Sequence, residues 1–115
     1  MAAIDWYYFR RNCSTCARTD EFLAAHQLDP ADRTNATRKL QRDDALRLAG
    51  EADRLIAIKR GAVDTLDLTA DPGEDAVLPL MLGPTGNLRA PLLKVGATLL
   101  IGFDESIYRD ILLDE

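Results

Sequence analysis

Two cysteines, Cys13 and Cys16, are separated by two residues, and this spacing restricts the folds and functions open to the chain more than any other feature. If two cysteines were placed at random among 115 residues, they would stand three positions apart in roughly 2% of arrangements, so the spacing is informative in itself. A pair with this spacing can form a structural disulfide, supply half of a zinc site, or act as a pair of redox-active thiols.

The residues around the pair favour the redox interpretation over the other two. A disulfide across so short a loop removes little entropy from the unfolded chain and is rare in reducing compartments. Zinc takes four ligands, usually as two Cys or His pairs, whereas this chain has one such pair and a single histidine, His26. We therefore interpret Cys13 and Cys16 as reactive thiols and expect no bound metal.

The cysteines stand at an expected junction between a strand and a helix. Residues 4–9 are aromatic and partly apolar, which is typical of a strand, and the apolar spacing of residues 14–26 predicts a helix. Cys13 would then lie at the helix start, where free backbone N–H groups and the helix dipole favour a thiolate. Arg10 and Arg11 add positive charge beside it, which also lowers a thiol pKa. Cys16 follows one turn later, within reach of a mixed disulfide formed at Cys13.

The rest of the chain continues the alternation of strands and helices. Pro79 is expected near the first turn of its helix, where a proline is tolerated, and Asp104 is expected to cap the last helix. The predicted elements are a short strand within 31–38, a helix over 43–52, a strand over 54–59, a turn at 60–61, a return strand over 63–68, a helix over 74–82, a hairpin of 92–95 and 98–101, and a helix from 104. This order predicts one α/β domain over residues 1–115, with a small mixed β-sheet flanked by helices.

Charge and hydropathy exclude several classes of function. The chain has 14 Lys and Arg against 19 Asp and Glu, a net charge of −5, whereas broad nucleic-acid binding needs a basic surface. No apolar run approaches the length of a membrane span, and the N-terminus lacks the pattern of a secretory signal. We therefore expect a cytoplasmic protein with no nucleic-acid or membrane partner.

The order of motifs resembles the thioredoxin fold, and within it the glutaredoxin-like branch that includes arsenate reductases of the ArsC type and Spx-type regulators. The resemblance is spread over most of the chain. It rests on Tyr8-Phe9 before Cys13-Ser14-Thr15-Cys16, Ala90-Pro91 opening a strand, Val95-Gly96, and Leu100-Ile101-Gly102-Phe103-Asp104 before the last helix. It implies a thioredoxin-like fold in which residues of about 40–82 form an insert of the ArsC/Spx kind.

The resemblance also implies roles for the matching positions. Cys13 would be the nucleophile and Cys16 the resolving thiol, with no bound cofactor and with glutathione as a co-substrate. Pro91 would follow a cis peptide bond, and the backbone of Ala90 would pair with a bound peptide or with glutathione. With Arg10 beside the nucleophile, the expected substrate- or glutathione-binding residues are Arg10, Ala90, Pro91, Gly102, Phe103 and Asp104.

Three functions compete on this basis. The first is a thiol–disulfide oxidoreductase that acts on a disulfide or a glutathionylated protein. The second is a Spx-like regulator that senses redox state through the cysteines and binds a partner protein without turnover. The third is arsenate reduction, for which ArsC-type proteins carry an arginine directly before the cis-proline. Here Ala90 occupies that place and Arg89 stands one residue earlier, so alternation along an extended segment predicts that Arg89 points elsewhere and that oxyanions bind poorly.

Overall fold

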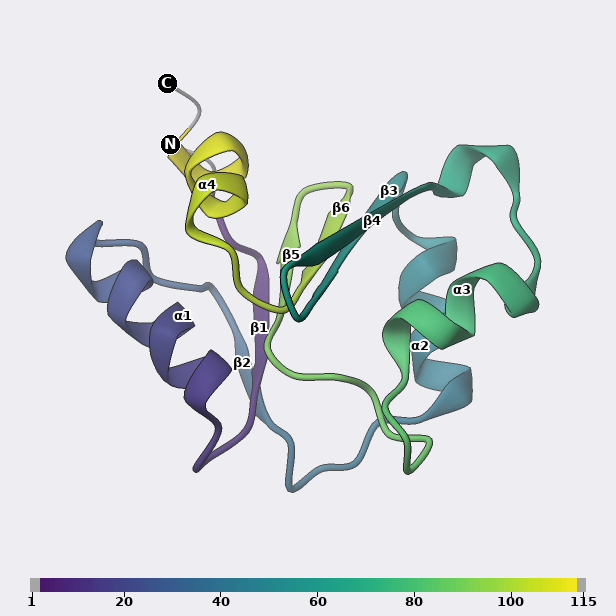
Figure 1. Ribbon diagram of the computed structural model, residues 1–115, viewed down its shortest axis with the longest axis horizontal. Coiled ribbons are helices and arrows are strands. Elements are labelled where there is room, and N and C mark those ends of the chain that lie inside the picture. The colour runs from purple at the N-terminus through teal and green to yellow at the C-terminus, as the bar shows by residue number, and fades with distance from the viewer. Residues whose placement is uncertain (1–2, 114–115) are drawn as a thin grey trace.

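Six strands form one mixed sheet with helices on both faces, in a computed structural model that describes residues 3–113 (Figure 1). The strands are β1 (Trp6–Phe9), β2 (Arg33–Asn35), β3 (Arg54–Lys59), β4 (Ala62–Asp67), β5 (Leu92–Val95) and β6 (Thr98–Ile101). The helices are α1 (Ser14–Ala25), α2 (Arg42–Gly50), α3 (Glu74–Met81) and α4 (Glu105–Tyr108), with a 3-10 turn over Leu68–Ala70 and a π-helical turn over Arg109–Leu113. The predicted α/β class with a mixed sheet is confirmed.

The sheet has the strand order β2-β1-β5-β6-β3-β4 and combines parallel with antiparallel pairs. Strand β1 runs parallel to β2, and β3 runs parallel to β6. A parallel pair needs a crossover connection, which α1 supplies between β1 and β2. The other three pairs are antiparallel, and the β3–β4 hairpin turns at Arg60 and Gly61. Their φ values of 50° and 80° suit a two-residue turn that requires positive φ at both positions.

Alternation along the strands divides the core between the two faces of the sheet. Tyr7 packs with the residues buried by α1 and α4, whereas Tyr8 packs with those buried by α2 and α3. Strand β3 behaves in the same way, with Ile56 on the first face and Leu55 on the second. Successive side chains of a strand point to opposite faces, so each strand supplies both cores. Figure 1 shows α1 and α4 on one side of the sheet and α2 and α3 on the other.

Residues 40–82, which the resemblance places in an insert, are built into the same sheet and core. They contribute α2, β3, β4 and α3. Leu48 of α2 and Val77 of α3 belong to one buried cluster with Tyr8 of β1 and Leu99 of β6. This segment therefore shares its hydrophobic core with the strands that precede and follow it.

The position of Pro79 differs from the prediction. It was expected near the first turn of its helix, but α3 begins at Glu74 and holds Pro79 well inside. A proline at this position cannot donate to the carbonyl of Asp75, four residues earlier. Asp75 and Pro79 are both exposed, so water can hydrate that carbonyl, and the buried Val77 and Met81 still attach the helix to the core.

The last helix begins as predicted. Oδ1 of Asp104 accepts the N–H of Ile107 at 3.0 Å, which confirms Asp104 as its N-cap. Tyr108 and Leu112 are fully buried and attach this end of the chain to the face covered by α1. Within residues 3–113, no helix combines the length and the apolar character needed to cross a membrane.

Candidate active site

Cys13 is the N-cap of α1, and its sulfur accepts a backbone hydrogen bond. The Cys16 N–H donates to Cys13 Sγ at a distance of 3.3 Å, and Cys13 itself has extended backbone angles. An N-cap is usually Ser, Thr, Asp or Asn, because an oxygen satisfies one of the free N–H groups of the first turn. Here a sulfur takes that place, and Asn12 precedes it with a positive φ of 57°, a conformation that asparagine tolerates.

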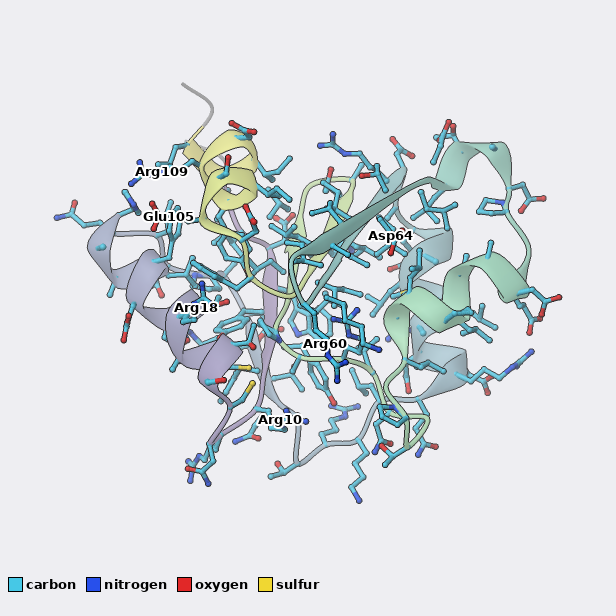
Figure 2. The ribbon with its side chains drawn as sticks, viewed as in Figure 1. Arg10, Arg18, Arg60, Asp64, Glu105 and Arg109 are labelled. Atoms are coloured by element: carbon cyan, nitrogen blue, oxygen red, sulfur yellow. The ribbon has the colours of Figure 1, made fainter. Side chains whose placement is uncertain are left out.

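The pKa of the Cys13 thiol lies below its ordinary value. Partial burial opposes ionisation, but it is outweighed by the Cys16 N–H, the Cys16 thiol and the Arg10 guanidinium, all of which stabilise the thiolate. Cys13 is half-buried and therefore keeps contact with solvent. In Figure 2 two sulfur atoms lie together near the start of α1, on the side of the molecule where Arg10 is labelled.

Cys16 differs from Cys13 both in its exposure and in the direction of its pKa shift. It is only 2% exposed, and burial, together with the neighbouring Cys13, raises the pKa of Cys16 to about 12. A buried thiol of this kind cannot be the first to meet a substrate. It can still attack a sulfur bonded to Cys13, because the two residues lie on one turn of the same helix. The two cysteines thus differ in their accessibility and in the direction in which their pKa is shifted.

Hydrogen bonds of three hydroxyl groups hold α1 against β1 and α4 just behind the cysteines. The Tyr7 hydroxyl donates to Oδ1 of Asp20 at 2.9 Å, and its oxygen also lies 3.4 Å from the Cys16 carbonyl oxygen. Burial, followed by the bond to Asp20, raises the pKa of Tyr7, so the phenol stays protonated. The Thr19 and Tyr108 hydroxyl oxygens are 3.0 Å apart, which links α1 to α4. The cysteine helix is therefore held at two points within its first two turns.

The Ala90–Pro91 peptide bond is cis, and this prediction is confirmed. The carbonyl of buried Pro91 accepts the N–H of Gly102 at 2.9 Å, so two of the predicted binding residues contact each other. The carbonyl of Gly102 accepts the Tyr108 hydroxyl at 2.6 Å. Both backbone groups of Gly102 are thus used inside the protein. Through these two hydrogen bonds Gly102 connects Pro91 with Tyr108 of α4.

Phe103 and Asp104 are both half-buried, but only Phe103 lines a hollow in the surface beside α1. Phe103 is half-buried, and the Arg18 guanidinium carbon lies 4.8 Å from the centre of its ring. It lines a hollow of about 350 Å³ that also contains Thr15, Ala90 and Gly102. Asp104 is absent from this lining, and its carboxylate caps α4.

A second hollow, of about 640 Å³, adjoins the first and shares four lining residues with it. The shared residues are Lys59, Arg60, Arg89 and Ala90, and we call the two hollows together the cationic cleft. The larger hollow adds Arg10 and Lys39 to this lining, and the smaller adds Arg18. Of the predicted binding residues, the structure brings Arg10, Ala90, Gly102 and Phe103 to the cationic cleft, whereas Pro91 and Asp104 lie outside its lining.

Arg89 lines the cationic cleft, and the prediction that its side chain points away from the place of the ArsC arginine stays a prediction. Its guanidinium donates to the Ile58 carbonyl at 2.7 Å and to the Leu80 carbonyl at 3.2 Å. The prediction assumed an extended strand, but residues 83–91 are mostly turn and loop, so strict alternation does not apply. A cation therefore does stand beside Ala90, and the argument against oxyanion binding from strand alternation does not hold.

Lys39, Lys59 and Arg60 are site residues that the sequence analysis missed. Lys59 and Arg60 were expected only as the end of a strand and a turn. Their position near α1 follows from the parallel pairing of β3 with β6, which places Ala57 opposite Ile101 and so brings the hairpin tip close to Gly102. The only local signal was an arginine in a turn where asparagine or glycine is preferred.

Among residues 3–113, no group of three or more His, Cys, Asp or Glu side chains is placed to hold a metal ion. Comparison with known proteins adds no assignment, because no protein-family model and no curated protein sequence matches this chain. The candidate site is therefore defined by its own geometry: an accessible, ionisable thiol, a buried thiol one turn later, and a cationic cleft whose lining includes neither cysteine but does include Arg10, the residue beside Cys13.

The two thiols are expected to react differently with iodoacetamide. Alkylation requires a thiolate, so the lowered pKa of Cys13 should make it react with a midpoint below that of an ordinary, solvent-exposed thiol. Cys16 should remain unmodified in the folded protein, because it is buried and its pKa is raised to about 12. Mass spectrometry of the two cysteines as a function of pH measures both. Arg10→Gln should move the Cys13 midpoint upward, and equal midpoints for the two thiols would contradict this description.

Proposed function

We propose that this protein is a thiol–disulfide oxidoreductase with a thioredoxin-like fold of the glutaredoxin/ArsC type. The observation that carries the proposal is the arrangement at the start of α1, where Cys13 Sγ accepts the Cys16 N–H at 3.3 Å beside Arg10. An accessible thiol with a lowered pKa is the usual nucleophile of disulfide exchange. The strand–cysteine–helix order and the cis Ala90–Pro91 bond beside the cationic cleft are in keeping with the fold assignment.

The first step would be attack by the Cys13 thiolate on one sulfur of a substrate disulfide. A bond forms between Cys13 Sγ and that sulfur, the substrate S–S bond breaks, and the other sulfur leaves as a thiolate that takes a proton from solvent. The N–H of Cys16 and the Arg10 guanidinium stabilise Cys13 in its attacking, charged form. With a glutathionylated protein as substrate, this step leaves either glutathione or the protein attached to Cys13.

The second step would be attack by Cys16 on Cys13 Sγ. Part of the raised pKa of Cys16 comes from the charge on Cys13. That charge disappears once Cys13 is in a mixed disulfide, so Cys16 becomes easier to ionise when it is needed. Cys16 gives its proton to the departing substrate thiolate, and a Cys13–Cys16 disulfide remains. The substrate disulfide has then gained two electrons and two protons, which two molecules of glutathione would return to the enzyme as they form oxidised glutathione.

Trapping of the first intermediate tests this mechanism. Cys16→Ser protein mixed with oxidised glutathione should accumulate one glutathione on Cys13, because the thiol that would release it is absent. Intact-mass and peptide mass spectrometry locate the adduct. Cys13→Ser is the matched variant and should remain unmodified, since Cys16 is 2% exposed. An adduct on Cys16, or none on either variant, would exclude Cys13 as the nucleophile.

A further inference from the structure

The cationic cleft concentrates positive charge in a chain that is acidic overall. Its six basic residues are Arg10, Arg18, Lys39, Lys59, Arg60 and Arg89, and neither hollow is lined by an aspartate or a glutamate. A hollow beside α2 has a different lining. It mixes four carboxylates with three cations, namely Asp5, Asp32, Asp44, Glu51, Arg38, Arg47 and Lys94. With a net charge of −5 over the whole chain, six cations without a carboxylate are a local feature of the cleft.

None of these six cations pairs with a carboxylate within residues 3–113, although Arg10 also lies beside the Cys13 thiol. The ion pairs there use Arg33, Arg42, Arg47, Lys94 and Arg109. Arg89 is half-buried, and its guanidinium donates hydrogen bonds to the carbonyls of Ile58 and Leu80. A partly buried charge without a counter-ion is unfavourable, and an anionic ligand in the cleft would remove that cost.

The lining also indicates which kind of anion fits. The larger hollow has apolar wall residues, Pro79, Leu82, Pro84 and Leu88, beside its cations. Such a mixture suits a polypeptide that carries both acidic and apolar side chains. Single-stranded nucleic acid would need exposed rings for base stacking. Tyr8 is 1% exposed, and Phe103 has Arg18 over its ring, so neither supplies such a platform.

We propose that the cationic cleft binds an acidic segment of a protein substrate, next to the disulfide that Cys13 attacks. The link to a disulfide rests on the function proposed above, whereas binding of the acidic segment does not. The cleft begins beside Thr15 and Arg18 on the first turns of α1 and extends past the β3–β4 hairpin tip to Lys39. In Figure 2 Arg18 is labelled on α1, Arg10 below the start of α1, and Arg60 near the middle of the view at the tip of the β3–β4 hairpin. Acidic residues near the reactive cysteine of a substrate would thus meet cations while that cysteine reaches Cys13.

A binding experiment tests the cleft without any chemistry. A short fluorescent peptide rich in glutamate and leucine is titrated with the reduced full-length protein, and a second peptide has glutamine in place of glutamate. Neither contains cysteine. We expect the acidic peptide to bind about tenfold more tightly or better. The double variant Lys59→Gln with Arg60→Gln should lose about tenfold in affinity for it. The matched variant Arg47→Gln with Arg54→Gln removes the same charge outside the cleft and should bind as the wild type does.

Several results would overturn the proposal. Equal affinity for the two peptides, or the same loss in both double variants, would mean that the cleft does not select acidic segments. Displacement of the acidic peptide by single-stranded RNA or by inorganic phosphate at lower concentrations than unlabelled peptide would assign the cleft to a different anion. All titrations are made at one ionic strength, because salt screens these contacts.

A turnover experiment separates this proposal from the proposed enzymatic function. Both peptides are prepared with one glutathionylated cysteine, and kcat/KM is measured for each with glutathione as reductant. The ratio of acidic to neutral substrate should be about ten for the wild type and should fall toward one in the Lys59→Gln, Arg60→Gln variant. If the acidic peptide binds selectively but neither glutathionylated peptide is reduced, the oxidoreductase function fails and the acidic-segment site stands. If both are reduced at equal rates, the substrate preference fails and the oxidoreductase function stands.

Discussion

Replacement of Cys13 by serine is expected to lower the rate of glutathione-dependent reduction of a glutathionylated peptide to the uncatalysed level. We expect a loss of about 10³-fold or more, because a serine hydroxyl is not ionised near neutral pH and cannot form the mixed disulfide. The other thiol cannot take over, since Cys16 is 2% exposed and its pKa is raised to about 12. The measurement couples the formation of oxidised glutathione to its enzymatic reduction and follows the consumption of nicotinamide cofactor.

Cys16→Ser is the matched control for this prediction. It removes the other thiol of the same helix turn but leaves Cys13 available, and external glutathione can release the first product from Cys13 without Cys16. This variant should therefore keep part of the wild-type rate with glutathione as reductant. Equal rates for wild type and Cys13→Ser would rule out the mechanism. Complete loss in both variants would show instead that the reaction requires the Cys13–Cys16 disulfide.

Patterns that act over a few residues predicted the elements well. The β5–β6 hairpin and β3 have the expected bounds, and each expected helix is present with ends shifted by no more than a few residues. The reason is that the strand and helix periods, the Gly96–Ala97 turn and the Asp104 cap are all encoded locally. The positions of the two cysteines depend on the same kind of information, because Cys13 at a helix N-terminus and Cys16 one turn later follow from their spacing and from the helix predicted over 14–26.

The cationic cleft could not be predicted from the sequence, because it is assembled by the pairing of strands that are far apart in the chain. Lys59 and Arg60 are far from α1 in sequence, and they approach it only because β3 pairs in parallel with β6. The side chain of Arg89 could not be oriented either, since the loop before Pro91 follows no strand or helix period and the arginine binds the carbonyls of Ile58 and Leu80. Pro79 shows a third limit of sequence-based prediction. Its place inside α3 is tolerated because it is exposed to water, and a short sequence pattern does not reveal that exposure.

Gly102 lies against Ile58 of β3 and donates a hydrogen bond to the Pro91 carbonyl. We expect Gly102→Ala to destabilise the protein severely. Its φ is +90°, and an added Cβ would lie 2.4 Å from the Ile58 carbonyl oxygen and 3.0 Å from the Ile58 Cβ. The unfavourable backbone conformation costs about 1–3 kcal/mol, and overpacking adds about 1–3 kcal/mol. A domain of this kind has a free energy of unfolding of about 5–15 kcal/mol, so a large share is lost. The same Ile58 carbonyl accepts the Arg89 guanidinium, so any movement also disturbs the cationic cleft.

Gly86→Ala separates the two causes of this destabilisation. Gly86 has a φ of +80°, close to that of Gly102, but an added Cβ there would meet no atom within 4 Å. It should therefore show the backbone cost alone, about 1–2 kcal/mol. Urea unfolding of both variants, followed by far-ultraviolet circular dichroism, gives the two free energies. If Gly102→Ala proved as stable as Gly86→Ala, the close approach of β6 to Ile58 would not be a fixed constraint on the fold.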